Sequence, residues 1–283
     1  MTAFTAGHYV WLVALGVGVG CYGTLIGAGG GFVLMPVLLL LYPNENPNLL
    51  TCISLAVVFF NALSGSQAYA MMKRIDYRSG LFFSMATIPG AVLGALNTSY
   101  VPRRTFDMIF AILLLGAAVF LVWRPSRTLR AQTTGSTASH KTTRRLVDAH
   151  GEHYQYAFNF RLGMMISGVV GYVSSFLGIG GGIIHVPALS YFLNFPVHVA
   201  TATSHFILAI MALTGTLVHI MTGTFAHGVH RTIALAIGVV LGAQIGAHLS
   251  EKVRGGWIIR GLAIALGVVG LRILFLSWER LAG

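Results

Sequence analysis

Two runs of glycine are the residues of this chain whose types and spacing most clearly suggest a binding site. The first reads Gly-Ala-Gly-Gly-Gly over residues 27–31 and is followed by Pro36; the second reads Gly-Ile-Gly-Gly-Gly over 178–182 and is followed by Pro187. Consecutive glycines break a helix because their backbone is free and they have no side chain to pack, and proline removes a further amide donor. A helix that starts after each run would direct unpaired N–H groups and the positive end of its dipole toward the break, which favours an anion.

The glycine runs also have a purely structural interpretation, in which they only allow helices to pack closely. Against it, broken helix inside a membrane occurs only where protein or water surrounds it, and matching breaks in two halves of a chain are typical of a transporter site. We therefore interpret the last three glycines of each run as substrate-binding residues. They are Gly29, Gly30, Gly31, Gly180, Gly181 and Gly182.

Hydroxyl and amide side chains inside the apolar segments are the other candidates. Hydroxyls near the start of the third apolar segment of each half would cap the helix or donate to an oxyanion; they are Thr51, Ser54, Thr201, Thr203 and Ser204. An amide buried in lipid needs a partner, so Asn61, Gln67 and Gln244 would bind either another helix or the substrate. His205 would carry a coupling proton or act as a neutral hydrogen-bonding residue.

No metal or cofactor site is expected. His227 and His230 are the only close pair of histidines beside a predicted loop, and a pair alone does not supply the ligands of a zinc site.

The composition indicates that these residues lie in a membrane. Hydrophobic residues make up 55% of the chain and charged residues 9%, whereas a soluble domain has roughly 25% charged residues. We therefore expect an all-α integral membrane protein that crosses the cell membrane, inner or plasma, several times. The net charge of +11 lies mainly between apolar segments, which favours anionic lipid headgroups rather than nucleic acid as its partner.

Ten apolar helical segments follow from the hydropathy of the chain. They cover residues 8–26, 31–42, 49–72, 79–99, 106–123, 160–178, 182–194, 198–222, 231–249 and 257–277. Eight approach the roughly 20 residues that a span requires. Segments 31–42 and 182–194 are shorter, and at ~1.5 Å per residue they would reach only about halfway across.

The chain divides into two related halves, residues 1–123 and 159–283, joined by a linker over 124–158. The glycine runs repeat at an offset of 151, the run Thr51 to Ser54 matches 201–204 at an offset of 150, and Gly90 and Gly94 match glycines at an offset of 148. Several matches in the same order indicate an internal repeat. We favour inverted repeats, in which each glycine run folds its neighbours into a re-entrant hairpin, over parallel repeats. The basic, Ser/Thr-rich linker is interpreted as a polar, flexible cytoplasmic segment.

The paired motifs over 27–36 and 178–187 resemble those of the TauE/SafE family of sulfite and organosulfonate exporters, as does the run Ala-Thr-Ala-Thr-Ser over 200–204 with its partner at Leu50 to Ser54. The resemblance covers nearly the whole chain except the linker. It implies a secondary transporter of sulfite, a sulfonate such as sulfoacetate, or a related small anion, driven by a gradient of H⁺ or Na⁺.

Two other classes of function remain to be compared with this one. A passive anion channel would use the same residues without coupling. A membrane-embedded enzyme is disfavoured, because the sequence contains no Gly-x-Ser-x-Gly, His-Glu-x-x-His or paired intramembrane carboxylates. A homo-oligomer is compatible with the sequence but not required by it.

Overall fold

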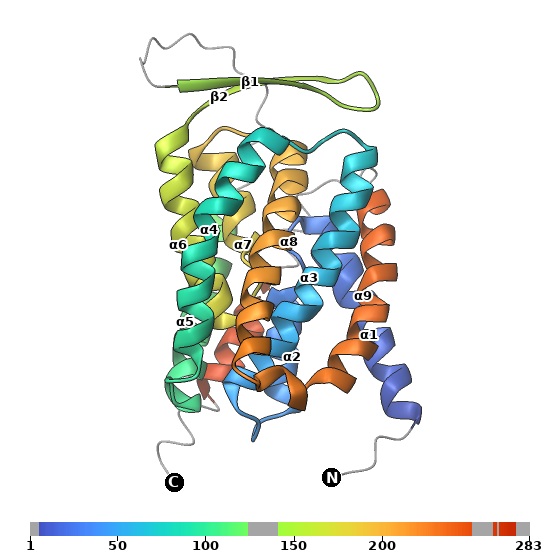
Figure 1. Ribbon diagram of the computed structural model, residues 1–283, viewed down its shortest axis with the longest axis vertical. Coiled ribbons are helices and arrows are strands. Elements are labelled where there is room, and N and C mark those ends of the chain that lie inside the picture. The colour runs from blue at the N-terminus through green and yellow to red at the C-terminus, as the bar shows by residue number, and fades with distance from the viewer. Residues whose placement is uncertain (1–5, 124–140, 251–262, 265, 276–283) are drawn as a thin grey trace.

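The computed structural model describes residues 6–123, 141–250, 263–264 and 266–275, which form a bundle of helices with a β-hairpin at one end (Figure 1). The first half contains α1 (Ala6–Ile26), α2 (Gly31–Leu41), α3 (Pro47–Met71), α4 (Tyr77–Thr98) and α5 (Arg103–Trp123). The hairpin consists of β1 (Lys141–Val147) and β2 (His153–Asn159). The second half contains α6 (Phe160–Leu177), α7 (Gly182–Pro187) with a π-helical continuation over Ala188–Phe192, α8 (Val197–Met221), a 3₁₀ turn over Thr224–His227, and α9 (Val229–Leu249). A last helix includes Leu266–Phe275.

Six of the described helices are long and apolar enough to cross a membrane: α1, α3, α4, α6, α8 and α9. They correspond to six of the eight predicted spans, and the prediction of an all-α membrane protein is confirmed. Of the other two, segment 106–123 lies in the 21-residue α5, and segment 257–277 lies partly outside the described residues.

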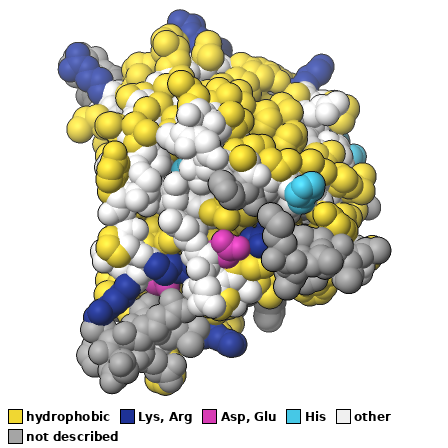
Figure 2. All heavy atoms as spheres, turned by 60° about the horizontal axis from the view of Figure 1, so that its bottom comes forward, with side chains coloured by type: hydrophobic (Ala, Val, Ile, Leu, Met, Phe, Trp, Pro, Cys, Tyr) yellow, Lys and Arg dark blue, Asp and Glu magenta, His cyan; other side chains and the backbone are white. Residues whose placement is uncertain are grey.

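The outer surface of the bundle is apolar, as lipid requires. Large hydrophobic side chains on the spans are exposed, among them Leu93, Ile112, Met165, Val169 and Ile237. Figure 2 shows hydrophobic side chains over much of one face, with Lys and Arg in small separate groups. A surface of this kind can face hydrocarbon, because its side chains are apolar and each helix pairs its own backbone N–H and C=O groups.

Close glycine contacts fix the relative directions of the spans. A Cβ on Gly238 of α9 would lie 2.2 Å from the carbonyl oxygen of Val13 in α1, and one on Gly246 would lie 2.2 Å from that of Cys21, so α1 and α9 run parallel. Contacts of Gly90 with Gly168 and of Gly94 with Tyr172 likewise make α4 and α6 parallel.

The helices α3 and α8, in contrast, run antiparallel. A Cβ on Gly65 of α3 would meet His205 of α8, whereas a Cβ on Gly215 of α8 would meet Leu55 of α3. Short connections fold α4 back on α3 and α9 back on α8 (Figure 1). Each helix of the first half therefore runs opposite to its counterpart in the second, the arrangement expected of inverted repeats. The repeat itself remains a prediction from the sequence.

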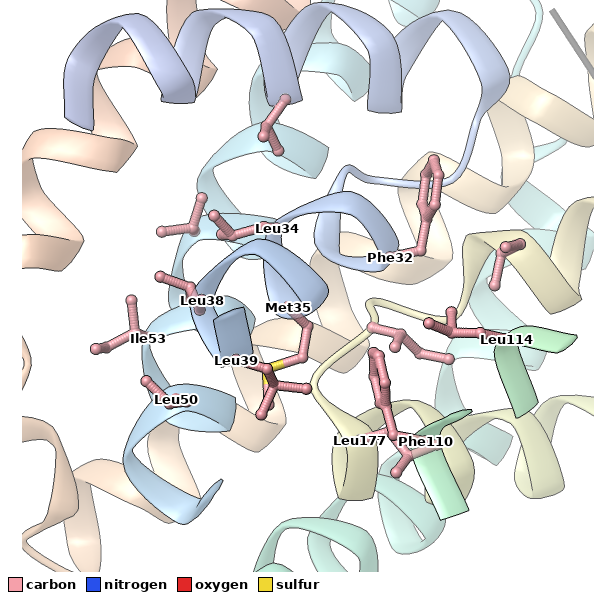
Figure 3. Packing of buried hydrophobic residues seen from close by; sticks show 14 of the residues in the cluster. Phe32, Leu34, Met35, Leu38, Leu39, Leu50, Ile53, Phe110, Leu114 and Leu177 are labelled. Carbon is pink, nitrogen blue, oxygen red and sulfur yellow. The ribbon is translucent and has the colours of Figure 1, made fainter. Parts of the chain in front are cut away.

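The half-length segments form broken hairpins with the helices before them. From the glycine break, α2 returns toward the end of the bundle where α1 begins, and α7 returns toward the end where α6 begins (Figure 1). The side chains of α2 are surrounded by protein: Leu34 and Leu38 lie toward Leu50 and Ile53 of α3, with Leu114 on the opposite side (Figure 3). Surrounding protein is the condition under which non-helical backbone is tolerated at membrane depth.

The prediction of a flexible linker is wrong for residues 141–158. Strands β1 and β2 pair in antiparallel register from Lys141 opposite Asn159 to Val147 opposite His153. Phe158 and Tyr156 pack with Phe83 of α4 and with Phe195, the residue close before α8, and this buried cluster holds the hairpin on the bundle. The basic composition of the predicted linker suggested a solvated segment, whereas buried and exposed residues alternate along β2. Residues 124–140 of the predicted linker lie outside the described residues.

Two ion pairs, one buried and one partly buried, attach the hairpin to the corner between α3 and α4. The Arg74 Nε lies 3.2 Å from Asp148 Oδ2, and Arg144 Nε lies 3.6 Å from Asp76 Oδ2. Asp76 also accepts hydrogen bonds from the Tyr156 hydroxyl at 2.8 Å and from the Ser79 amide at 3.1 Å. Burial raises the pKa of Asp148, but hydrogen bonds from the Glu152 and His150 amides and from Arg74 outweigh it, so that its pKa is lowered.

We predict that Asp148→Ala loosens the hairpin. The variant loses the ion pair with Arg74 and the acceptor of two backbone amides, which costs about 1–3 kcal/mol. Amide hydrogen exchange over 141–159 should then become roughly ten- to hundredfold faster, whereas the exposed Arg145→Ala should leave it unchanged. Because the folded pKa is lowered, the contribution is present above about pH 4. Protection in the wild type should therefore fall as the pH drops below that value, and equal protection in the wild type and Asp148→Ala at neutral pH would contradict the prediction.

Candidate functional site

The two glycine breaks adopt the same backbone conformation. Gly27, Gly29 and Gly30 have φ values of 83°, 75° and 78°, and Gly178, Gly180 and Gly181 have values of 68°, 78° and 71°. This left-handed region is open to glycine and strained for other residues. The sequence therefore needs glycine at these positions to turn the chain from one helix into the next.

The two breaks lie against each other. A Cβ on Gly31 would lie 2.7 Å from the carbonyl oxygen of Ile179, and a Cβ on Gly182 would lie 2.3 Å from the Cα of Ala28. Any side chain at these two positions would push the breaks apart. The contact joins segments separated by some 150 residues in the sequence, and it brings together the glycines predicted from the two motifs.

The antiparallel helices α3 and α8 hold the breaks from the side. A Cβ on Gly27 would lie 3.0 Å from the Cα of Thr201 in α8, and one on Gly178 would lie 3.0 Å from the Cα of Thr51 in α3. Val58 of α3 contacts the Gly29, Gly31 and Gly180 positions, and Leu208 of α8 contacts Gly29. Thr51 and Thr201 therefore occupy matching positions, as do Val58 and Leu208, each pair at an offset of 150.

The helix starts at the breaks have no side-chain caps. The N-cap residues are Gly30 for α2 and Gly181 for α7, and neither has a side chain to accept hydrogen bonds from the first turn. The first amides of a helix lack partners within the helix, and their positive partial charge attracts anions. The site thus has positive character without a buried cation: among the described residues the buried charged side chains are Arg74, Asp76, Asp107 and Asp148, which lie at helix ends or in the hairpin.

Buried hydroxyl groups surround the breaks. The Ser54 hydroxyl donates to the Gly178 carbonyl oxygen at 2.5 Å. The hydroxyl groups of Thr51, Ser174 and Ser204 are buried and form no hydrogen bond with any described residue. Ser174 faces the Gly181 position, where a Cβ would lie 2.5 Å from its oxygen. These hydroxyls are donors that an oxyanion would satisfy.

A second polar group, which we call the Asn61 cluster, lies beside the first break and consists of Thr24, Asn61, Tyr69 and His205. The Thr24 hydroxyl donates to Asn61 Oδ1 at 3.2 Å, and His205 Nε2 lies 3.4 Å from the same hydroxyl oxygen. The Tyr69 hydroxyl donates to the Thr24 carbonyl at 2.8 Å, and its ring packs edge-on against His205. All four side chains are at most 1% exposed.

The remaining predicted residues lie elsewhere. Gln67 is exposed on α3, and Gln244 of α9 donates to the carbonyl and hydroxyl oxygens of Ser64, so it joins two helices. Thr203 accepts a hydrogen bond from the Asp76 amide beneath the hairpin. The capping role predicted for the hydroxyls is wrong, because α3 begins at Pro47 with Asn46 as its cap and α8 begins at Val197.

The sequence interpretation missed Thr24, Tyr69 and Ser174 as neighbours of the breaks, and Val58 and Leu208 as the apolar residues between them. A signal was present, since Thr24 and Ser174 lie shortly before the glycine runs and Val58 and Leu208 are separated by the repeat offset.

Comparison with known proteins relates the sequence of this chain to a family of transporters. The family model described as sulfite exporter TauE/SafE matches residues 12–273. The probable membrane transporter protein YunE of Bacillus subtilis is 33% identical over 274 residues, 94% of this chain and 97% of that protein. A probable membrane transporter protein of Methanocaldococcus jannaschii is 22% identical over 93% of this chain and 94% of its own length, and one of Xylella fastidiosa is 26% identical over 91% of both chains. No solved structure matches the chain.

We predict that Gly182→Ala destabilises the protein more than Gly18→Ala. The added methyl group of Gly182→Ala would overlap the backbone of the opposite break at 2.3 Å, whereas a Cβ on Gly18 meets nothing within 4 Å. Overpacking of this kind lowers the free energy of unfolding by about 1–3 kcal/mol. The methyl group of Gly18→Ala, in an exposed helix position, causes no such loss. Thermal unfolding in detergent measures the difference, and equal midpoints for the two variants would show that the breaks do not touch.

Proposed function

The chain belongs to the sulfite exporter TauE/SafE family, and on this basis we propose that it is a secondary transporter of small anions. The proposed substrates are sulfite, sulfonates such as sulfoacetate, and related sulfur oxyanions. The observation that carries the proposal is the contact between two uncapped helix starts, α2 and α7, inside the bundle. The nearby hydroxyls offer donors to an oxyanion, and so do the first-turn amides that have no partner among the described residues, those of Gly31 and Phe32 in α2 and of Ile183 in α7. The Gly182 amide is already bonded to the Gly180 carbonyl oxygen at 2.9 Å.

Transport proceeds by alternating access in this proposal. The close parallel pairs α1–α9 and α4–α6 each join a helix of one half to a helix of the other through glycine contacts. Each pair would move as a unit with the broken hairpin attached to it, while α3 and α8 lie between them. Since the two pairs run in opposite directions, exchange of their positions would open the site first to one side and then to the other. A gradient of H⁺ or Na⁺ would drive the cycle.

The hairpin end of the bundle is proposed to face the cytoplasm. Among the described residues, basic residues at that end outnumber those at the other end: Lys73, Arg74, Arg78, Lys141, Arg144, Arg145 and Arg161 compared with Arg103, Arg104 and Arg231. Cytoplasmic connections of membrane proteins carry an excess of Lys and Arg.

We predict that the purified protein in liposomes catalyses counterflow. Vesicles loaded with unlabelled sulfite or sulfoacetate should transiently accumulate the labelled anion above its external concentration, because a carrier exchanges one bound anion for another. Net uptake should depend on an imposed gradient of H⁺ or Na⁺. The measurement is filter-bound radioactivity over time.

Two controls connect the flux to the proposed site. Gly181→Leu should abolish counterflow, because it places a side chain at a position with φ of 71° against Ser174. Gly116→Leu, at a position where a Cβ meets nothing within 4 Å, should retain it. Flux without counterflow or gradient dependence would identify a passive channel, and chemical conversion of the anion without a membrane would identify an enzyme.

A further inference from the structure

The Asn61 cluster exists in only one of the two halves. In the second half, the positions at offsets of 150 and 151 from Thr24, Asn61 and Tyr69 are Ser175, Met211 and His219, and the position that matches His205 is Leu55. The geometry follows the same correspondence. A Cβ on Gly65 would meet His205 and Thr24, and a Cβ on the matching Gly215 would meet Leu55 and Ser175.

Two nitrogen atoms of the cluster, Asn61 Nδ2 and His205 Nδ1, are buried without a hydrogen-bond partner among the described residues. Thr24 has a single hydroxyl proton and donates it to Asn61 Oδ1. This bond orients the amide of Asn61, and His205 Nε2 lies 3.4 Å from the same hydroxyl oxygen. The Asn61 Nδ2, with two N–H donors, is then left buried without a hydrogen-bond partner among the described residues. A donor left in this state is costly unless a ligand accepts from it.

Asn61 lies next to the glycine breaks. It follows Val58 by one turn of α3, and Val58 contacts the Gly29, Gly31 and Gly180 positions. Thr24, whose hydroxyl orients the Asn61 amide, lies three residues before the first break, and its carbonyl oxygen accepts a hydrogen bond from the Gly27 amide at 2.9 Å. The free amide is therefore close to the uncapped start of α2.

We propose that the Asn61 amide is a donor to the transported anion and that each chain binds one oxyanion, on the side of the first break. Thr24 and His205 are positioning residues that fix the orientation of the amide. In the second half, Met211 and Leu55 supply apolar side chains at the positions that match Asn61 and His205, so no equivalent amide donor is present there. This inference rests on the proposed function, because it names the residue that selects the anion within the same site.

The test is Asn61→Met, which copies the residue at the matching position of the second half. Sulfite counterflow should show a KM raised roughly ten- to hundredfold, since a hydrogen bond to a charged ligand is lost, with ligand-free thermal stability close to that of the wild type. The matched control is Met211→Leu, whose KM should stay within about twofold of the wild type. Thr24→Val should raise the KM in the same direction, and Thr24→Ser, which keeps the hydroxyl, should restore it.

A second variant tests the sign of the charge on the ligand that the Asn61 amide binds. Asn61→Asp keeps the shape of the side chain and replaces the amide donors with a negative charge, so sulfite should no longer raise the thermal stability of the protein. Stabilisation of the wild type by Na⁺ and not by sulfite would instead identify a cation site and overturn the proposal. An unchanged KM in Asn61→Met, in a protein whose wild type performs counterflow, would overturn this inference and leave the proposed function intact. Absence of any anion flux in the wild type would overturn both this inference and the proposed function.

Discussion

The structure depends on a constraint that lipid imposes on the backbone: an N–H or C=O group at membrane depth must find a partner within the protein. A broken helix violates this rule unless other segments surround it. Here the break between α1 and α2 is covered by the break between α6 and α7, and both are held by α3 and α8. The contact requires glycine on each side, because a single methyl group at Gly31 or Gly182 would meet backbone atoms of the opposite break. Two glycine-rich loops that would each be unstable in lipid thus stabilise one another.

The same contact gives the site its chemical character. The glycine caps leave the Gly31 and Phe32 amides of α2 and the Ile183 amide of α7 without a partner among the described residues. The buried hydroxyl groups of Thr51 and Ser174 add further donors next to the second break. Positive character arises from dipoles rather than from a buried Lys or Arg, whose transfer from water would be expensive. An anion that lost its water in such a site would gain these donors in return.

Much of the fold could be predicted from sequence because a helix in lipid must be apolar over a known length. The ends of α2, α6 and α9 lie within a few residues of the predicted segments, and the glycine runs mark both breaks. The β-hairpin could not be predicted in this way, since Arg74, Arg144 and Asp148 appear as solvated charges until the folded chain brings them into ion pairs. Asn61 and Gln67 were equivalent amides on one apolar segment. Only the packing of α3 shows that Asn61 faces the breaks and Gln67 faces outward.

The position of a bound anion would show whether the paired breaks form an anion site. Selenite has the shape and charge of sulfite and a heavy atom that can be located by anomalous scattering or as a density peak. We expect one selenium position per chain, with the selenite oxygens within hydrogen-bond distance of the first-turn amides of α2 or α7 and of Asn61. Selenium bound instead in the cavity of about 500 Å³ at the end of the bundle, lined by residues such as Glu45, Tyr100 and Arg103, would contradict it.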